Sequence, residues 1–467
     1  MTIGASLTWT LARSLALLVV FGWLIPPLAT WVRGRPHRWG YLLAPFVFPE
    51  LLVGYAYAPW VMGHPWLSEL ACSLLLGLRT LPAAVVAWEL SPPGSVSASA
   101  CYCRQLSLRT WADRWDCWRL RWEGPARRWI PAGGLFLLVT FQEFELAALL
   151  RTVSWTDWLF VRQATGMELA AALRSAALPA TMELAGLLLV LTLVARSPES
   201  AVHPDDHSAD SARGWVAAAV FLPAAWLLVI GAPLVPLAAE LPGGLANLMG
   251  QRLRWLGLGK ELAVGISAAA CASAMAWFAA ERLLRCGAFG RVAVVVLSVP
   301  GLLGSLILGL LLLALFQGRV FSSLYDTPVP WLLGLTWYLL PRAILLQIWI
   351  THGVSTALKL VELLRQSADF AQHRAGRRLW RAMVTRPRLL AVVVLAYWAY
   401  LELTLAHLLA PMGLTAGIVR LYNFMHYGRT AALSAEAAVL LLVPLLGTWG
   451  VWTLWGGRWR GRSSSGG

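Results

Sequence analysis

The chain has 467 residues, of which 58% are hydrophobic and only 13% are charged, and its mean hydropathy is +0.64. Soluble domains carry roughly 25% charged residues, so this composition excludes an ordinary soluble enzyme. The formal charge is +15, from 38 Lys and Arg against 23 Asp and Glu. In a membrane protein such an excess is typical of cytoplasmic loops. The expected fold class is an all-α polytopic membrane protein.

Eleven apolar segments are each long enough to cross a bilayer, which takes about 20 residues. They cover residues 8–32, 40–60, 67–88, 130–150, 168–195, 215–237, 261–283, 292–316, 330–351, 389–410 and 431–455. About eleven transmembrane helices are therefore predicted.

Basic residues fall unevenly between these spans. One alternating set of connections, which includes the long segments 89–129 and 352–388, holds 26 Lys and Arg, and the opposite set holds 8. Because positively charged loops stay in the cytoplasm, the first set is predicted to be cytoplasmic. The N-terminus is then outside and the C-terminus is cytoplasmic.

Three pairs of segments indicate an internal repeat. Pro49–Leu52 (PELL) corresponds to Pro300–Leu303 (PGLL), and the dipeptide at 81–82 corresponds to the one at 340–341. Glu143–Leu150 (EFELAALL) corresponds to Glu402–Leu409 (ELTLAHLL). Because the pairs keep their order and predicted direction, we expect two parallel repeats of five helices, typical of transporters.

The repeats imply two halves and one additional helix. Residues 197–211 (SPESAVHPDDHSADS) are polar and rich in Ser and Pro, as in flexible linkers. The predicted N-terminal half is 1–196, with about five spans. A polar cytoplasmic linker at 197–213 follows, and the C-terminal half, 214–467, has about six spans with 215–237 as the additional helix.

The C-terminal half carries a family resemblance. Its motifs are Val299-Pro300-Gly301, Ser323–Thr327 (SLYDT), Glu402-Leu403-Thr404 and Arg420–Gly428 (RLYNFMHYG). They resemble the permease subunits of binding-protein-dependent ABC importers, in particular the fused two-half permeases of the ferric-iron and thiamine group. The resemblance implies a multi-pass protein of the bacterial inner membrane that forms the translocation path of an ATP-driven importer.

The same resemblance implies a loop that couples transport to an ATPase. Its residues by register are Phe370, Ala371, Gln372, Gly376, Arg377 and Trp380. Ala371, Gly376 and Trp380 fit the family pattern, whereas its acidic residue and second alanine are absent. The corresponding segment of the first half, between Ser91 and Arg128, lacks the pattern and is basic and rich in tryptophan.

The expected partners follow from the resemblance and from a missing motif. No phosphate-binding G-x-x-x-x-G-K-[ST] sequence occurs in the chain. The chain is therefore predicted not to be an enzyme and to bind no cofactor, because a separate ABC ATPase subunit, expected as a dimer, would use the ATP. An extracytoplasmic solute-binding protein and membrane lipid are the other expected partners, and nucleic acid is not one. Ferric iron is the solute that the resemblance suggests.

Ionisable residues within spans are candidates for function because they are costly in a bilayer. They are Glu50, Glu143, Glu145, Glu183, Glu402 and Glu436. Glu143 and Glu402 occupy equivalent repeat positions, so they are the candidate translocation path. The alternative is that each is a buried carboxylate bonded to a Thr, Tyr or Arg on a neighbouring helix, with Arg79 and Arg342 as possible partners.

The remaining candidates lie outside the spans. Tyr422 and His426 follow a span on the predicted outer side and could contact a binding protein or the solute. Cys101, Cys103 and Cys117 share one segment without a histidine, and no metal site is predicted, because structural zinc usually takes four ligands.

Two other function classes stay open. An ion-coupled secondary transporter could use parallel repeats with Glu143 and Glu402 as ion-binding groups. An intramembrane transferase would need paired acidic residues at a membrane face to hold a metal and a diphosphate, and only Asp205-Asp206 approaches this. ATPase binding by 352–388, or transport that follows an ion gradient, would distinguish the two transporter classes.

Overall fold

The computed structural model describes residues 2–33, 35–91, 105, 110–195, 212–352, 355–366, 369–425 and 431–456. Throughout these ranges the regular secondary structure is helical. The chain divides into two compact units, Met1–Pro236 and Leu237–Gly467, which are called unit 1 and unit 2.

Among the described residues, nine helices are long and apolar enough to cross a membrane, and the number rises to eleven if each of two bent helix pairs is one span. The bent pairs are His37–Val47 with Glu50–Val61, at 56°, and Val292–Leu302 with Ser305–Gln317, at 100°. The protein is therefore an all-α, multi-pass membrane protein, as the composition predicts.

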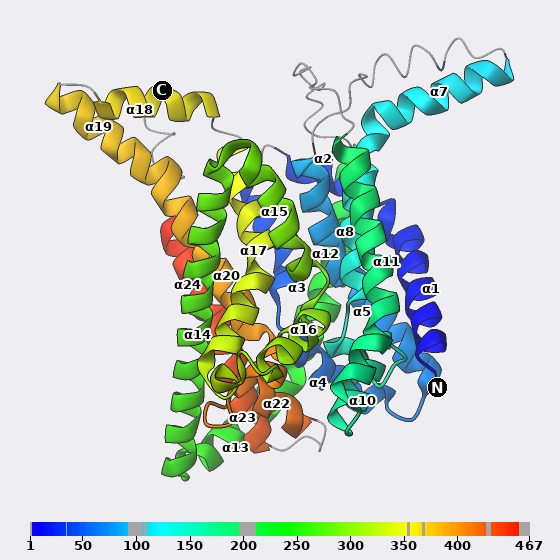
Figure 1. Ribbon diagram of the computed structural model, residues 1–467, viewed down its shortest axis with the longest axis vertical. Helices are drawn as coiled ribbons and strands as arrows, with labels where there is room; N and C mark the ends of the chain where they lie inside the picture. Colours follow the sequence, from blue (N-terminus) through cyan, green and yellow to red (C-terminus); the bar gives the residue numbers. More distant parts are fainter. Residues whose placement is uncertain are drawn as a thin grey trace. The chain divides into compact units, whose positions relative to one another are not determined.

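Unit 1 begins with α1 (Ile3–Gly22) and α2 (Ile25–Val32), and most of its helices are labelled in Figure 1. The other elements up to the end of the first repeat are α3 (Pro36–Val47), α4 (Glu50–Val61), α5 (Pro65–Leu90), α7 (Trp111–Glu123), η1 (Pro125–Arg128), α8 (Trp129–Phe141), α9 (Glu145–Leu149), α10 (Trp155–Ala164) and α11 (Leu169–Ala195).

Unit 2 has the longest single α-helix of the described chain, α14 (Arg252–Arg285). The elements after it are α15 (Gly287–Leu302), α16 (Ser305–Gln317), η3 (Ser322–Leu324), α17 (Pro328–His352), α18 (Ser355–Gln366), α19 (Phe370–Trp380), η4 (Arg381–Thr385), α20 (Arg386–Leu401), α21 (Leu403–Leu409), α22 (Gly417–Met425), α23 (Ala431–Ala437), η5 (Ala438–Leu442) and α24 (Val443–Gly456).

The two units contain the same series of elements. In each, a bent helix pair precedes a long span, and a polar, basic segment then leads into a second span. That second span ends at a break in the helix. A short helix follows the break, and a further span comes later in the chain. The order α3, α4, α5, α7, α8, α9, α10, α11 thus corresponds to α15, α16, α17, α19, α20, α21, α22, α23. This correspondence supports the predicted repeat.

The bends have local causes. In unit 1, α3 ends because Phe48 precedes Pro49 and is extended, with ψ 137°; a residue before proline disfavours the α conformation. In unit 2, Gly304 has φ +86°, a conformation that suits glycine, and separates α15 from α16.

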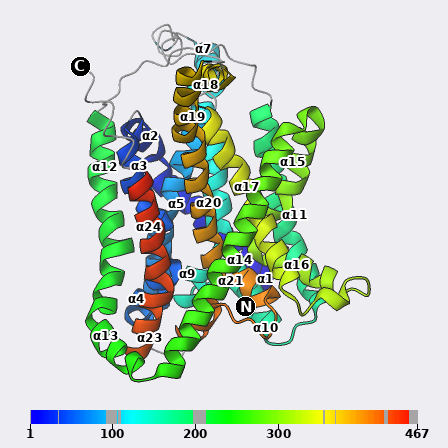
Figure 2. The same cartoon turned by 90° about the vertical axis from the view of Figure 1, so that its left-hand side faces the viewer.

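The additional helix runs from α12 (Ala212–Ala225) through the π-helical turn η2 (Trp226–Gly231) into α13 (Ala232–Met249), as Figure 2 shows. Within unit 1, α12 packs against α2 and α5. The Tyr57 hydroxyl donates a hydrogen bond to the Leu228 carbonyl at 2.8 Å, which satisfies one carbonyl of the π turn. Residues 197–211 of the predicted linker lie outside the described residues, so the sequence-based boundary stays a prediction.

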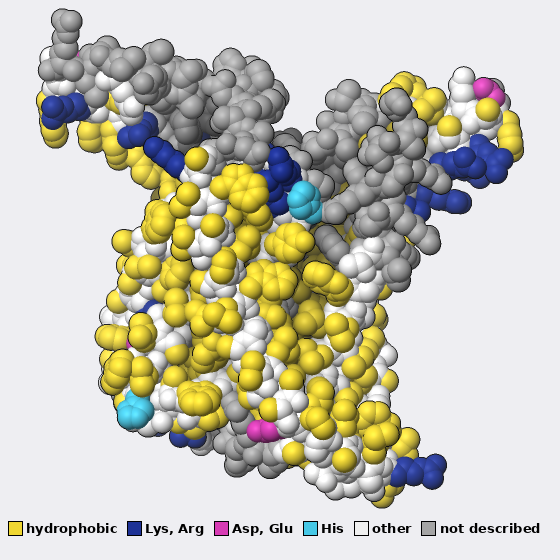
Figure 3. Space-filling view, turned by 180° about the vertical axis from the view of Figure 1, so that it is seen from behind, with side chains coloured by type: hydrophobic (Ala, Val, Ile, Leu, Met, Phe, Trp, Pro, Cys, Tyr) yellow, Lys and Arg dark blue, Asp and Glu magenta, His cyan; other side chains and the backbone are white. Residues whose placement is uncertain are grey.

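The surface agrees with a bilayer environment. The face in Figure 3 is mainly hydrophobic over its middle, and its Lys and Arg side chains lie mostly towards its ends. Exposed apolar side chains include Val19 and Trp23 on or after α1, Val220 on α12, and Phe278 on α14. Such exposure is expected where lipid replaces water as the solvent.

Candidate functional site

The two repeat-related glutamates occupy the same kind of helix break. Glu143 lies between the end of α8 at Phe141 and the start of α9 at Glu145, and Glu402 lies between α20 and α21. Both side chains are buried, at 7% and 8% exposure. The structure thus gives these two predicted residues equivalent local positions, one in each unit.

Both carboxylates accept hydrogen bonds from the short helix that follows. The Leu146 amide donates to Glu143 Oε1 at 2.8 Å. Glu402 Oε1 accepts from the amides of Thr404 and Leu405, at 3.2 and 3.4 Å. The first amides of a helix lack partners within the helix, so each glutamate caps one helix inside the bundle. Both residues are thus buried, hydrogen-bonded carboxylates, but these hydrogen bonds come from backbone amides and not from the Thr, Tyr or Arg side chains that the alternative predicts.

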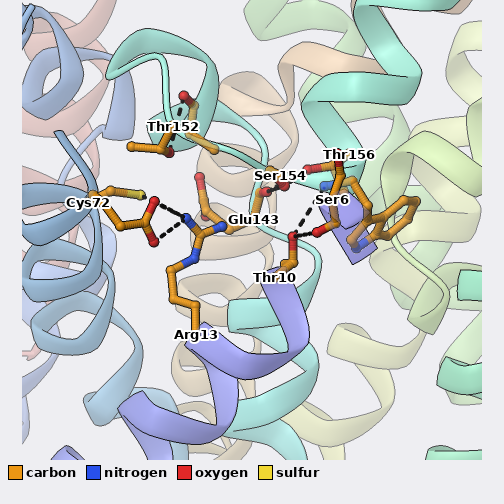
Figure 4. A network of polar contacts seen from close by, with 11 residues as sticks. Ser6, Thr10, Arg13, Cys72, Glu143, Thr152, Ser154 and Thr156 are labelled. Atoms are coloured by element: carbon orange, nitrogen blue, oxygen red, sulfur yellow. Dashed lines mark hydrogen bonds and ion pairs between the residues drawn. The ribbon is translucent and has the colours of Figure 1, made fainter. Parts of the chain in front are cut away.

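In unit 1, hydroxyl groups satisfy the remaining backbone of the break (Figure 4). Ser154 and Thr156 donate from Oγ and Oγ1 to the Glu143 carbonyl, at 3.3 and 2.6 Å. The Trp155 indole donates to the Phe141 carbonyl at 2.8 Å. Non-helical backbone at membrane depth requires such partners, so the start of α10 holds the break in place.

Two ion pairs lie close to Glu143 in unit 1. Arg13 on α1 bonds to Glu69 on α5, at 3.0 Å and 3.2 Å to the two carboxylate oxygens, and Figure 4 shows the Arg13 guanidinium beside Glu143. Arg79 on α5 pairs with Glu50 at 2.6 Å and donates to the Phe48 carbonyl at 2.5 Å. Arg79 therefore holds the bend between α3 and α4, and its ion pair is with Glu50 rather than with Glu143, for which the sequence makes it a possible partner.

In unit 2, polar groups from α16 and α17 surround Glu402. The side chains of Ser305 and Tyr338 lie near its carboxylate. The Arg342 guanidinium stacks on the Tyr338 ring, 3.7 Å from its centroid, and donates to the Tyr338 carbonyl at 2.6 Å. Ser305 begins α16 as Glu50 begins α4, so each glutamate lies near the first residue of the second helix of a bent pair.

Glycines let these elements approach each other closely. A Cβ on Gly54 of α4 would lie 2.4 Å from Leu149 Cδ1 of α9. A Cβ on Gly309 of α16 would lie 2.6 Å from Leu408 Cδ1 of α21. In each unit the second helix of the bent pair thus packs, through a glycine, on the glutamate-capped helix.

The predicted coupling residues belong to a helical hairpin. Asp369 caps α19 by accepting from the Ala371 amide at 2.9 Å. Gly376 is buried against α18, where an added Cβ would lie 2.7 Å from the Arg365 amide nitrogen. His373 Nδ1 lies 2.6 Å from the Arg365 carbonyl. Gly376 is therefore a point of close backbone contact between α18 and α19.

The other predicted coupling residues differ in exposure. Phe370, Ala371, Gln372 and Arg377 are exposed, whereas Trp380 is half-buried beneath the Arg365 guanidinium, 4.4 Å from its ring centroid. Figure 2 shows the hairpin extending beyond the end of α20, with which α19 is continuous through η4. Leu360 and Leu363 of α18 add exposed apolar side chains.

The predicted outer-face pair is only partly described. Tyr422 lies on α22 and is 5% exposed, so its side chain presents little surface in this conformation. His426 lies outside the described residues. The segment instead contributes Arg420, which pairs with Glu261 of α14 and stacks on Phe424.

Sequence reasoning missed a second ion pair near Phe424. Arg254 of α14 pairs with Glu436 of α23, whose side chain is fully buried. Glu436 stands out in the sequence as a charge within a span, but nothing in the sequence identifies its partner, 182 residues away.

Glu183 is a buried carboxyl of a different kind. It lies on α11, is 5% exposed and sits near the Gln142 side chain, but neither carboxyl oxygen forms a hydrogen bond of normal geometry.

In unit 2, a cavity of about 280 Å³ is lined by Trp277, Glu281, Gln347 and Arg388, among others. The described residues contain no cluster of three or more His, Cys, Asp or Glu able to hold a metal.

The geometry is thus a pair of equivalent, internally capped helix breaks and a projecting hairpin. Comparisons with family models, curated proteins and solved structures find no match to this chain.

Proposed function

We propose that the chain is the translocation subunit of an ATP-driven importer of the bacterial inner membrane. One observation carries the proposal: the α18–α19 hairpin extends from the span α20 and is built on the close contact at Gly376. A rigid projection that continues a membrane helix can transmit movement of an attached ATPase to the bundle. The sequence resemblance assigns ATPase coupling to the same residues.

The repeated architecture supports the same function. Each unit contains a bent helix pair packed against a short capped helix, and transporters commonly use repeated units with broken helices. An ATPase that binds one conformation more tightly would shift the population between inward- and outward-open states. Ferric iron stays the proposed solute, on the resemblance alone.

An ion-coupled secondary transporter is the second candidate, and Glu183 is the observation that favours it. A carboxyl buried within a span without a normal hydrogen bond is a candidate ion or proton carrier. Glu143 and Glu402 favour it less, because capping accounts for their burial. Loss of gradient-driven transport in Glu183→Gln, with folding unchanged, would support this candidate.

The direct test of the importer is purification of the tagged chain from native membranes, with assay of ATP hydrolysis and mass spectrometry of the associated subunits. The variant Phe370→Ala with Leu363→Ala removes exposed apolar contacts of the hairpin without touching Gly376. We expect an ATPase with the parent and its loss with this variant. Val320→Ala, which removes an exposed apolar side chain outside the hairpin, is the matched control and should retain the ATPase.

Gly376→Ala gives a second variant with a different physical effect. Its Cβ would clash with the backbone of α18, so the hairpin should open while the spans stay folded. We expect the ATPase to be lost here too. If no ATPase accompanies the parent under conditions that keep a known importer intact, the proposal is wrong, and the ion-coupled transporter becomes the leading candidate.

A further inference from the structure

Helix α7 presents an exposed row of tryptophans. Trp111, Trp115, Trp118 and Trp122 are between 40% and 78% exposed. Trp115 stacks on Trp118 at 5.0 Å between ring centroids, and Trp118 contacts Trp122 edge-on at 5.8 Å. The indoles of Trp115, Trp118 and Trp122 thus form a continuous surface, and Trp111 lies one helical turn before Trp115. The four residues are called the tryptophan stripe, and an exposed apolar surface of this kind in water requires a partner.

The charges of α7 are ordered around this stripe. At about 100° per residue, the four tryptophans lie within an arc of about 60°. Arg114 and Arg121 border the stripe on one side and Arg119 borders it on the other, each about 60–100° from its centre. The acidic residues Asp113 and Asp116 lie further round, more than about 100° from the centre. Asp113 also forms the capping box with Thr110 that begins the helix.

The position of α7 along the chain places it next to a bilayer. The candidate span that contains α8 begins at Ala126, three residues after the end of α7 at Glu123. Gly124, with φ −107° and ψ −124°, ends α7, and η1 then leads into α8. Figure 1 shows α7 leaving the end of α8 obliquely rather than continuing its axis.

We propose that α7 is an interfacial helix that lies on the membrane leaflet where α8 begins, with the tryptophan stripe inserted at the level of the lipid headgroups. Tryptophan favours this region because its ring is apolar and its N–H finds polar partners there. Arginines at the edges of the stripe would meet lipid phosphates, while the acidic residues face water. This order of side chains is that of interfacial amphipathic helices, and the inference does not depend on the proposed importer function.

The test measures the depth of individual α7 residues in the full-length chain, reconstituted without any other protein. In a variant whose six native cysteines are replaced, a nitroxide is attached to Trp115→Cys, Trp118→Cys or Asp116→Cys. Electron paramagnetic resonance then compares the accessibility of each label to oxygen, which enters lipid, and to a water-soluble nickel complex. Liposomes of phosphatidylcholine alone and with phosphatidylglycerol show the contribution of anionic headgroups.

We expect the labels at 115 and 118 to shift towards oxygen accessibility and the label at 116 to stay accessible to nickel, so that depth follows the helical period of about 3.6 residues. Anionic lipid should increase the immersion because of the bordering arginines. Equal nickel accessibility at all three positions in both lipids would overturn the proposal, and the stripe would then be a surface for a protein subunit. The two tryptophan variants keep three of the four tryptophans of the stripe, and the Asp116→Cys variant keeps all four. Circular dichroism checks the folding of each variant.

Discussion

At the scale of single residues, the main finding is the role of the buried carboxylates. Glu143 and Glu402 each accept backbone amides at the start of a short helix, so their burial is satisfied locally. In a bilayer, water cannot replace such a partner. In the sequence, a charged residue within a span marks each glutamate as a candidate for the translocation path. The structure gives a second reason for its presence, because the broken backbone needs an acceptor for its free amides.

Replacing these carboxylates by alanine should destabilise the protein more than replacing them by glutamine. Glu143→Ala and Glu402→Ala each leave buried amides unpaired and should lower the free energy of unfolding by about 1–3 kcal/mol. Glu143→Gln and Glu402→Gln keep an oxygen acceptor and should stay closer to the parent. Unfolding in detergent measures the difference. Equal stability of the alanine and glutamine variants would contradict the capping role.

Asp157 on α10 should make stability depend on pH. It lies outside the candidate spans, and burial raises its pKa from 3.8 to about 6. Because the folded state binds this proton more tightly than the unfolded state, the free energy of unfolding should fall as the pH rises from about 4 to about 6. Asp157→Asn removes this dependence, so its melting temperature relative to the parent should be higher at pH 7.5 than at pH 4.5. A difference that is the same at both pH values would count against this account.

At the scale of elements, close packing at glycine joins the bent helix pairs to the capped helices. The same contact recurs in both units, between α4 and α9 and between α16 and α21. In membranes, small residues allow helices to approach closely, which gives van der Waals packing that lipid cannot replace. The two repeats therefore share a helix-packing contact as well as the order of their elements.

Alanine at these contacts should be destabilising in both units. Gly54→Ala and Gly309→Ala force Leu149 and Leu408 to move, and overpacking of this kind costs about 1–3 kcal/mol. Gly257 of α14 has open space around its Cβ position, so Gly257→Ala is the matched control and should be neutral or slightly stabilising. Thermal unfolding in detergent compares the three, and stability equal to the control at both packed positions would contradict the contacts.

At the scale of the whole molecule, the predicted arrangement is two parallel repeats with the basic segments in the cytoplasm. Both α7 and the α18–α19 hairpin belong to these basic segments and precede the span that ends in a glutamate-capped break. Parallel repeats would therefore place them on the same side of the membrane.

Cysteine labelling in cells tests this arrangement. In the variant without native cysteines, Arg114→Cys and Arg377→Cys should react with a membrane-impermeant maleimide only after permeabilisation. Arg319→Cys, between α16 and η3, should react in intact spheroplasts. Labelling of 114 and 377 from opposite sides would exclude parallel repeats, and labelling of 319 from the inside would reverse the predicted orientation.

Hydrophobicity and motif order are properties of neighbouring residues, so the sequence alone was enough to predict the all-α membrane fold, the approximate number of spans and the equivalence of Glu143 and Glu402. The contact at Gly376 and the Arg254–Glu436 pair, in contrast, became visible only in the tertiary structure. Such features join residues from different helices, or they depend on which backbone amides lack a hydrogen-bond partner at a helix break. No periodicity records such partners, which is why the capping of both glutamates emerged only from the folded chain.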